Sequence, residues 1–185
     1  MHGDTVKEQW INVAVPLAIP QNLNGVTMVI APHPDDESLG CGGTIALLKN
    51  AGEEVYIVFV SDGSMSHPNS KKYPAEQLVQ LREEEALAAA KALDVAEENC
   101  IFLKLKDAFV PALYSVDFSF AVNIMADVIK SINPANIILP WKNDPHPDHK
   151  ASWQIANAAV KQAGSKAQLL HYLIWFSRTK RTTHP

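Results

Sequence analysis

Short apolar runs rich in β-branched residues alternate with longer segments of helical periodicity along most of this chain. The expected strands fall at residues 26–31, 54–60, 100–105, 136–140 and 168–175, and the expected helices at about 39–51, 75–93, 117–132 and 148–164. Continuous apolar strands are typical of a parallel sheet that is buried on both faces. The sequence therefore predicts a Rossmann-like, doubly wound α/β domain. We expect a mostly parallel sheet of about five strands, in the common order 3-2-1-4-5, with helices on both faces.

The length and the cysteine content are compatible with one such domain. A chain of 185 residues corresponds to about one domain by the usual length relation. We expect a single domain at residues 26–185, preceded by an irregular arm at residues 1–25. The two cysteines, Cys41 and Cys100, are too few for a disulfide framework and favour a reducing compartment.

Charge and hydropathy exclude several classes of partner. A net charge of −4 provides no basic surface for nucleic acid. No stretch approaches the roughly 20 apolar residues of a transmembrane helix, and the N-terminal residues lack the basic segment of a signal peptide. We therefore expect a cytoplasmic protein whose partner is a small molecule. The oligomeric state stays open, with a homo-oligomer as one alternative.

Two turns of related sequence concentrate side chains of the kind that bind metals. His33-Pro34-Asp35-Asp36-Glu37 follows the first expected strand, and His146-Pro147-Asp148-His149 follows the fourth. In the expected strand order, the first and fourth strands are neighbours, and ligands bind in the crevice outside their carboxyl ends. The fold thus brings together residues that are far apart in the sequence, which predicts one divided metal site.

The residue types in these turns indicate hydrolytic metal chemistry. A catalytic zinc ion takes three ligands from histidine nitrogens and carboxylate oxygens and leaves one position open for water. We assign His33, Asp36 and His149 as ligands, with Zn²⁺ as the default and Fe²⁺ as the alternative. Such a metal lowers the pKa of its water to about 7. Asp35 is then the candidate general base, and His146 is the candidate acid that also stabilises the oxyanion.

Other acidic residues in the turns have candidate supporting roles. Asp148 is expected to hold His146 in the required tautomer, as carboxylates beside catalytic histidines do. Glu37 is expected to bond to the backbone at the start of the following helix. Helix capping is the alternative role for Asp35 and Asp36, because acidic residues are common at helix N-termini.

The same residues resemble the signatures of a known family. Residues 31–37 with the following Gly40-Cys41-Gly42-Gly43-Thr44 resemble the first signature of the LmbE-like (PIG-L) zinc deacetylases, and residues 146–149 resemble the second. Arg82-Glu83-Glu84-Glu85-Ala86 is similar to the family's Arg-x-x-Glu-Ala segment, and Asp107 falls where the family has an acidic residue after the third strand. The resemblance covers about residues 26 to 175. It implies the same ligands, base and acid as the assignment from the residues.

The resemblance also implies residues that contact the substrate. Members of the family remove the acetyl group from N-acetylglucosamine-type substrates, and Arg82 and Asp107 would hold sugar hydroxyls. From the residues alone, Arg82 also suits an ion pair with Glu84 or Glu85 across a helical turn, and Asp107 also suits a capping role. Trp141, which flanks the second turn, is a candidate for stacking on a sugar face.

These features together predict a metal-dependent hydrolase that removes the N-acetyl group from an N-acetylglucosamine-type sugar or sugar conjugate. One alternative is an amidase that cleaves a larger amide in a sugar–thiol conjugate, because the same site serves both reactions. Another is a catalytically silent sugar-binding relative. The chain has a residue of the required type at every ligand and base position, which argues against the silent relative.

Overall fold

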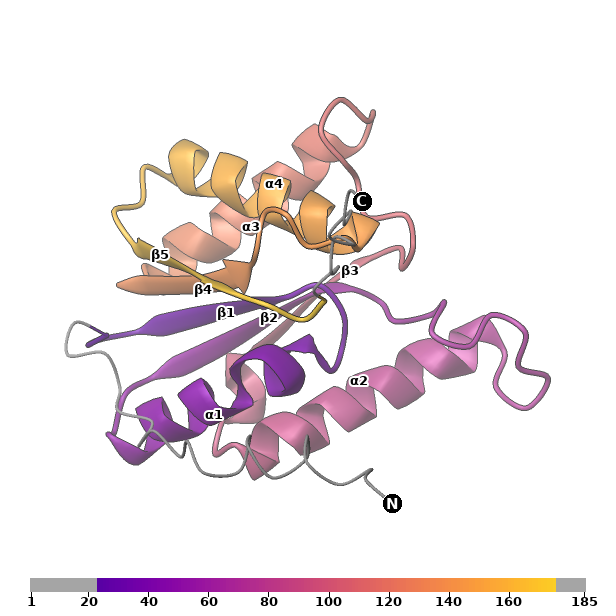
Figure 1. Cartoon of the computed structure of the whole chain (residues 1–185), viewed down its shortest axis with the longest axis horizontal. Helices are drawn as coiled ribbons and strands as arrows, with labels where there is room; N and C mark the ends of the chain where they lie inside the picture. Colours follow the sequence, from indigo (N-terminus) through magenta and orange to yellow (C-terminus); the bar gives the residue numbers. More distant parts are fainter. Residues whose placement is uncertain (1–22, 176–185) are drawn as a thin grey trace, which may run out of the picture.

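A parallel sheet of five strands in the order β3-β2-β1-β4-β5 runs through the middle of the protein (Figure 1). The computed structural model describes residues 23–175, so most of the expected N-terminal arm lies outside the described residues. The strands are β1 (Thr27–Ala31), β2 (Val55–Ser61), β3 (Cys100–Leu105), β4 (Asn136–Pro140) and β5 (Gln168–Tyr172). Every neighbouring pair is parallel. The predicted fold class and strand order are confirmed.

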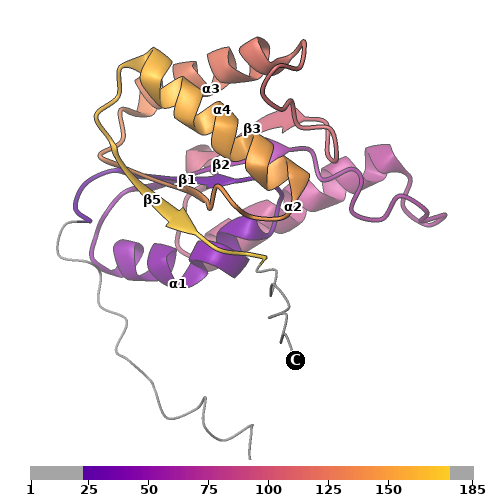
Figure 2. The ribbon, with the colours of Figure 1, turned by 45° about the horizontal axis from the view of Figure 1, so that its top comes forward.

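Two helices cover each face of the sheet. They are α1 (Asp36–Asn50), α2 (Ala75–Ala92), α3 (Phe118–Ile132) and α4 (Pro147–Ala163), with a short 3₁₀ turn η1 (Glu97–Asn99) before β3. Helices α1 and α2 lie on one face, and α3 and α4 lie on the other (Figures 1 and 2). None of the helices in the described part of the chain is long and apolar enough to cross a membrane.

Side chains of the central strands supply a core on both faces. Along β1, Met28 and Ile30 join the cluster that includes residues of α3 and α4, whereas Val29 and Ala31 join the cluster that includes residues of α1. Successive residues of a strand point to opposite faces, so a strand covered on both sides must be apolar throughout. This explains why all five residues of β1 are buried.

The helix ends have the backbone geometry that their residues favour. Helix α4 begins with Pro147, whose fixed φ suits the first helical position, and is capped after its last residue by Gly164 with φ 65°. Helix α3 is capped in the same way by Asn133, which lies in the left-handed region with φ 49°. Helix α1 begins at Asp36, earlier than the predicted start near residue 39. Asp36 and Glu37 of the first His-Pro-Asp turn are therefore part of the helix, whereas Asp35 precedes it.

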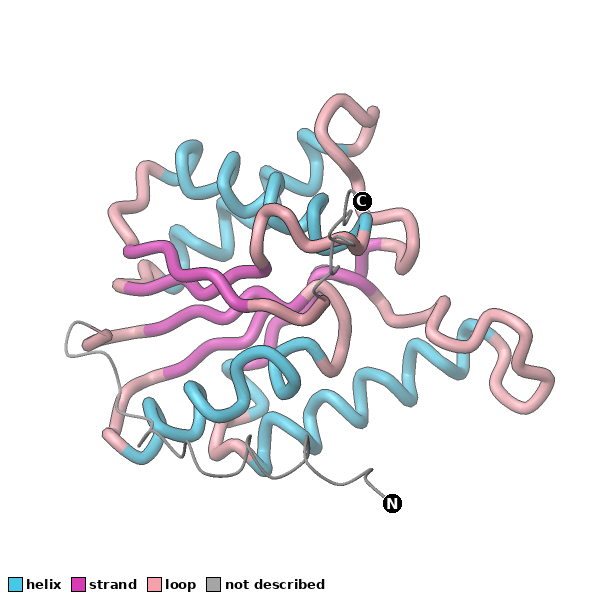
Figure 3. The backbone as a smooth tube through the Cα atoms, viewed as in Figure 1, coloured by secondary structure: helices cyan, strands magenta, loops and turns pink. Residues whose placement is uncertain are grey.

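The longer loops gather at the carboxyl end of the sheet (Figure 3). Strand β1 pairs with β4 from Thr27 opposite Asn136, which brings the turns after these strands together. Between β2 and β3 the register shifts after Phe59. Lys104 has φ 55° near this irregularity, and the chain that follows β3 enters the same end of the sheet.

Candidate metal centre

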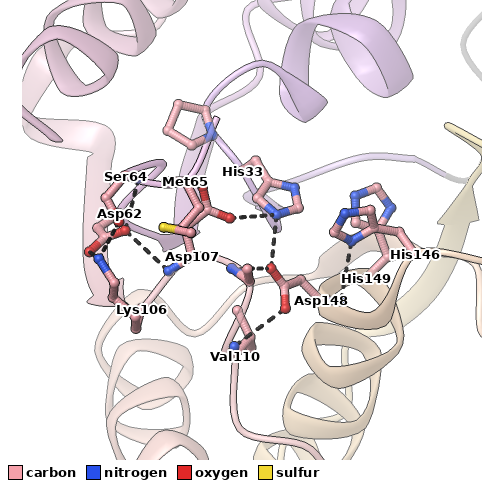
Figure 4. A network of polar contacts seen from close by, with 12 residues as sticks. His33, Asp62, Ser64, Met65, Lys106, Asp107, Val110, His146, Asp148 and His149 are labelled. Atoms are coloured by element: carbon pink, nitrogen blue, oxygen red, sulfur yellow. Dashed lines mark hydrogen bonds and ion pairs between the residues drawn. The ribbon is translucent and has the colours of Figure 1, made fainter. Parts of the chain in front are cut away.

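Three histidine rings meet where the turns after β1 and β4 converge. His33 lies in the first turn, and His146 and His149 lie at the start of α4. The ring centroids are 4.9 Å apart for His33 and His146, 5.3 Å for His33 and His149, and 4.8 Å for His146 and His149. The two His-Pro-Asp turns therefore converge, as the topology predicted (Figure 4).

The buried carboxylate of Asp36 lies between two of these imidazoles. Its Oδ2 atom is 3.2 Å from Nδ1 of His33 and 3.2 Å from Nε2 of His149. The same oxygen accepts the backbone N–H of His33 at 3.0 Å, which fixes the carboxylate in the turn. Burial opposes the charge on Asp36, but the two histidines outweigh it and lower its pKa below the ordinary value.

Two of the three pairs among these side chains have the spacing expected of ligands to one divalent cation. Metal–nitrogen and metal–oxygen bonds of about 2.1 Å in a tetrahedral site place neighbouring ligand atoms about 3.4 Å apart. The 3.2 Å separations on either side of Asp36 match this spacing. Within residues 23–175, two groups that share His33 have three ligand-type atoms within 4.8 Å of one another, namely His33 with His146 and His149, and His33 with Asp107 and Asp148. Asp36 belongs to neither of these groups.

Carboxylates also face the other nitrogen of both predicted histidine ligands. Nε2 of His33 lies 3.1 Å from Oδ2 of Asp148 and 3.4 Å from Oδ1 of Asp107. Nδ1 of His149 lies 3.2 Å from Oδ2 of Asp144, at hydrogen-bond distance but without hydrogen-bond geometry. Metal-binding histidines commonly present their second nitrogen to a carboxylate, which fixes the ring and raises its basicity. The arrangement supports a metal centre more specifically than the residue types alone.

The electrostatics of His33 reflect this environment. Burial lowers its pKa, but hydrogen bonds to Asp107, Asp148 and Asp36 outweigh that cost and raise the pKa to about 11. A histidine among three carboxylates is thus held as a cation unless another positive charge takes its place. A divalent cation bound beside these carboxylates would supply that positive charge.

The predicted role of Asp148 is wrong in one respect. Its carboxylate does not hold His146 but faces His33 and accepts the backbone N–H groups of Ala108 at 2.9 Å and Val110 at 3.3 Å. These bonds tie the start of α4 to the loop after β3 (Figure 4). Only the backbone N–H of Asp148 contacts His146, through Nδ1 at 3.2 Å. Because side chains at a helix start point in different directions, adjacency in the sequence did not reveal which histidine this carboxylate faces.

The contact with Asp148 defines the tautomer of His146. Since Nδ1 accepts a backbone N–H, the neutral ring carries its hydrogen on Nε2. Burial and the neighbouring His33 and His149 lower the pKa of His146. A neutral imidazole of this kind remains a hydrogen-bond donor through Nε2.

Asp35 and Arg82 form an ion pair at the pocket wall. Nη2 of Arg82 lies 2.8 Å from Oδ2 of Asp35, and it also donates to the carbonyl oxygen of Pro34. Nη1 of Arg82 contacts Glu85 at 2.7 Å, which is one of the two helical partners expected from the sequence. Burial and the charge of Asp36 raise the pKa of Asp35, and Arg82 opposes that increase.

Asp107 lies inside the site and is held by the loop after β2. Its Oδ2 accepts the backbone N–H of Met65 at 2.8 Å, and its own N–H donates to Oδ1 of Asp62 at 3.1 Å. Asp62 also accepts the backbone N–H of Ser64 at 3.0 Å. These bonds join the loops after β2 and β3 and turn Asp107 toward His33 (Figure 4).

A pocket of about 360 Å³ opens over this cluster. His33, Asp35, Asp36, Arg82, Asp107, His146 and His149 all line it. Trp141 is not among the lining residues, so the structure does not support the predicted stacking role. Trp175, Ile174, Leu39 and Met65 line the pocket instead. Residues 173–175, which the sequence assigned to the last strand, lie beyond β5, and two of them, Ile174 and Trp175, line the pocket.

Asp144 is the main site residue that sequence reasoning missed. It is completely buried, contacts His149, and accepts the backbone N–H groups of His146 at 2.9 Å and Trp175 at 3.3 Å. A signal was available, because an aspartate two residues before a candidate metal-binding turn is well placed to bond to that turn.

Fold and site together define a doubly wound α/β protein with a cluster of histidines and carboxylates, which could bind a metal, at the carboxyl end of its sheet. The model of the PIG-L family, described as GlcNAc-PI de-N-acetylase, matches residues 28–160. The chain therefore belongs to the PIG-L family.

Curated relatives and solved structures agree with this assignment. A probable N-acetyl-alpha-D-glucosaminyl L-malate deacetylase 2 of Bacillus subtilis is 32% identical over 127 residues, which cover 67% of this chain and 55% of the relative. A diacetylchitobiose deacetylase of Thermococcus kodakarensis is 30% identical over 140 residues, which cover 74% of this chain and 49% of the relative. The chain thus spans about half the length of these relatives.

Among solved structures, N,N'-diacetylchitobiose deacetylase from Pyrococcus horikoshii, in complex with an inhibitor, superposes with a TM-score of 0.67. It is 27% identical, and the match covers 78% of this chain and 53% of that protein. The conserved protein TT1542 from Thermus thermophilus gives the same TM-score of 0.67 at 28% identity, over 83% of this chain and 68% of that protein.

Proposed function

We propose that this protein is a metal-dependent hydrolase that removes the acetyl group from an N-acetylated amino sugar or a conjugate of one. The observation that carries the proposal is the position of Asp36 between the imidazoles of His33 and His149 at the base of an open pocket. Fold alone does not define a reaction. The proposal therefore depends on this cluster in a chain of the PIG-L family.

His33, Asp36 and His149 are the residues that would hold the metal. Their nitrogen and oxygen donors suit Zn²⁺, and Fe²⁺ is the alternative in a reducing compartment. A divalent cation held there would act as a Lewis acid that polarises a carbonyl group and makes a water molecule more acidic.

Asp35 is proposed to take the proton from the attacking water. Its side chain lines the pocket and keeps 52% of its surface exposed, so a water molecule can reach it. The raised pKa of this carboxyl makes it a stronger base than an ordinary aspartate. The ion pair with Arg82 at 2.8 Å limits the orientations that the carboxylate can take.

His146 is proposed to stabilise the oxygen that becomes negative when the amide is attacked. Its Nδ1 is already occupied by the backbone N–H of Asp148, so Nε2–H is the free donor of the neutral ring. The neutral ring would become an imidazolate if it gave up this hydrogen, so the proton that Asp35 takes from the water is the one that would pass to the leaving amine. A positioned acid or base of this kind contributes a rate factor of about 10²–10⁴.

The substrate class is proposed from the relatives and from the lining of the pocket. The names of the relatives specify a malate glycoside of N-acetylglucosamine, diacetylchitobiose and an inositol glycoside, which share an N-acetylated glucosamine unit. Arg82 and Asp107 line the pocket and are proposed to bond to sugar hydroxyls. Trp175 lies at the same pocket and offers an apolar surface for a sugar ring.

The test is acetate release from a panel of N-acetylated substrates. The purified chain is stripped with a chelator, reloaded with one equivalent of Zn²⁺ or Fe²⁺, and incubated with N-acetylglucosamine, its malate and inositol glycosides, and diacetylchitobiose. We expect metal-dependent release of acetate and free amine, and loss of that activity in Asp35→Ala. A metal-loaded, folded protein that releases no acetate from any of these compounds contradicts the proposal.

A further inference from the structure

Asp35 has a backbone conformation that aspartate rarely adopts. Its φ is 138° and its ψ is −25°. The other non-glycine residues of positive φ within residues 23–175 have φ between 49° and 74°, as is usual for the left-handed region. A conformation outside these regions costs about 1–3 kcal/mol and persists only when surrounding contacts enforce it.

A buried carboxylate holds this strained residue. Oε2 of Glu37 accepts the backbone N–H of Asp35 at 2.9 Å, and Oε1 accepts the hydroxyl of Ser38 at 2.7 Å. Glu37 has no exposed surface, and burial raises its pKa while these hydrogen bonds oppose the increase. Burying a carboxylate is costly unless it makes specific bonds, so this side chain is specifically placed.

Glu37 leaves the carboxylate of Asp35 free for the pocket. Asp35 precedes the first residue of α1, where an aspartate normally turns back to cap the helix N–H groups. Its side chain makes no such capping bond. Its carbonyl oxygen accepts the N–H groups of Ser38 at 3.1 Å and Leu39 at 2.9 Å, so the backbone of Asp35 is held on both sides while the carboxylate points to Arg82 and the pocket.

We propose that Glu37 is a positioning residue for the candidate base: its buried carboxylate holds the backbone N–H of Asp35 and maintains the strained turn that directs the Asp35 carboxylate into the pocket. The proposal rests on the proposed function, because it gives Asp35 the role of base. It assigns Glu37 neither to the metal nor to the substrate. A role confined to helix capping is the alternative that the experiments must separate.

The first experiment compares kinetic constants and metal affinity. Glu37→Met removes the acceptor at similar length, and Glu37→Asp keeps the charge but shortens the reach. We expect each to lower kcat at least about tenfold, within the 10²–10⁴ that a positioned base supplies, with KM and zinc affinity unchanged. Glu37→Gln retains an acceptor oxygen and should lose less. Glu76→Met is the matched control, because Glu76 is an exposed acid in the first turn of α2.

The decrease in kcat that follows replacement of Glu37 should also depend on the presence of the Asp35 carboxylate. In the Asp35→Ala background, Glu37→Met should cause no further decrease in turnover, since the group that it positions is absent. A similar decrease in both backgrounds would show that Glu37 acts through the fold in general and would overturn the proposal. A combined loss of kcat and zinc affinity in Glu37→Asp would overturn it too.

A second experiment needs no activity and measures the strain itself. Asp35→Gly and Asp35→Ala both remove the carboxylate, but only glycine relieves a φ of 138°. The backbone strain that glycine relieves is larger than the conformational entropy that an added glycine costs on folding. The Asp35→Gly protein should therefore have a melting temperature about 2–4 °C above that of the Asp35→Ala protein. A difference of about 1 kcal/mol in the free energy of unfolding produces a shift of this size in a chain of this length. In a Glu37→Asp or Glu37→Met background, the difference should vanish or reverse.

The two experiments separate failure of this inference from failure of the proposed function. An inactive parent protein contradicts the proposed function, whereas the melting temperatures still test whether Glu37 enforces the strain. If the difference between Asp35→Gly and Asp35→Ala persists after Glu37 is replaced, Glu37 does not maintain the turn, whatever the activity.

Discussion

Asp144→Asn should weaken metal binding, although Asp144 is not itself a predicted ligand. Asp144 is completely buried, and its two oxygens accept the backbone N–H groups of His146 and Trp175. Its Oδ2 atom also lies 3.2 Å from Nδ1 of His149. A carboxylate is the only side chain of this size that accepts on both oxygens. An asparagine must direct its NH₂ group at one of these donors, so the substitution removes a charge and also creates a donor–donor contact.

The expected size of the effect follows from the geometry. A full charge on the ring of His149, at 3.2 Å from the Asp144 oxygen, would interact with the carboxylate by about 5 kcal/mol at an effective dielectric constant of 20. A neutral ring bound to a cation carries only a fraction of that charge. We therefore expect a loss of about 1.4–2.7 kcal/mol, or 10–100-fold in metal affinity, the range observed when carboxylates that support metal-binding histidines are replaced.

The assay is a competition titration of zinc against a chromophoric chelator, with metal-free parent and variant protein at one pH and ionic strength. Asp127→Asn is the matched control, because Asp127 is on α3 and keeps 75% of its side-chain surface exposed. Circular dichroism and a thermal melt of the metal-free proteins check the fold. An Asp144→Asn protein that is folded and binds zinc as tightly as the parent would refute the reasoning. An equal loss in Asp127→Asn would refute it as well.

Five further predictions concern the candidate metal site and the packing of α1. His149→Ala should bind less than one equivalent of zinc by elemental analysis, whereas Asp35→Ala should keep the metal and lose about 10²–10⁴ in kcat. Chelation of the metal should lower the melting temperature, since a ligand at a hundred times its Kd stabilises the folded state by about 2.7 kcal/mol. Gly40→Ala should lower the free energy of unfolding by about 1–3 kcal/mol, because its Cβ would overlap the tyrosine ring at the end of β5. Gly42→Ala, with its nearest neighbouring atom at 4.0 Å, should raise it by about 0.5–1 kcal/mol; denaturant titration measures both.

The sequence was sufficient to predict the fold because its strands are short, mostly apolar runs. All five residues of β1 and of β4 are buried, so their pattern could not be confused with a half-exposed strand. The two boundary errors both lie near the site. The start of α1 was hidden by acidic residues that resemble a loop. The apolar residues 173–175 resemble a continued strand, although two of them line the pocket.

The site was predictable as a set of residues but less so as a set of contacts. Strand order placed His33, Asp36 and His149 together, and the structure has Asp36 at 3.2 Å from both imidazoles. The direction of Asp148 depends on the loop after β3, whose backbone N–H groups attract its carboxylate. That loop lies beside α4 only in the folded chain, so a pattern of neighbouring residues carried no information about it.

The carboxylates that face His33 and His149 come from two loops and from the start of α4. His33 is supported by Asp107 from the loop after β3 and by Asp148 from α4, whereas His149 is supported by Asp144 from the turn after β4. Asp107 is itself held by the backbone N–H of Met65 and the carboxylate of Asp62, both in the loop after β2. A substitution that makes any one of these loops more mobile should therefore also change the orientation of a histidine ring, because a single carboxylate connects the loop to the ring. Because ring orientation controls the affinity for a metal, loop substitutions outside the two His-Pro-Asp turns should alter metal binding more than their distance in sequence suggests.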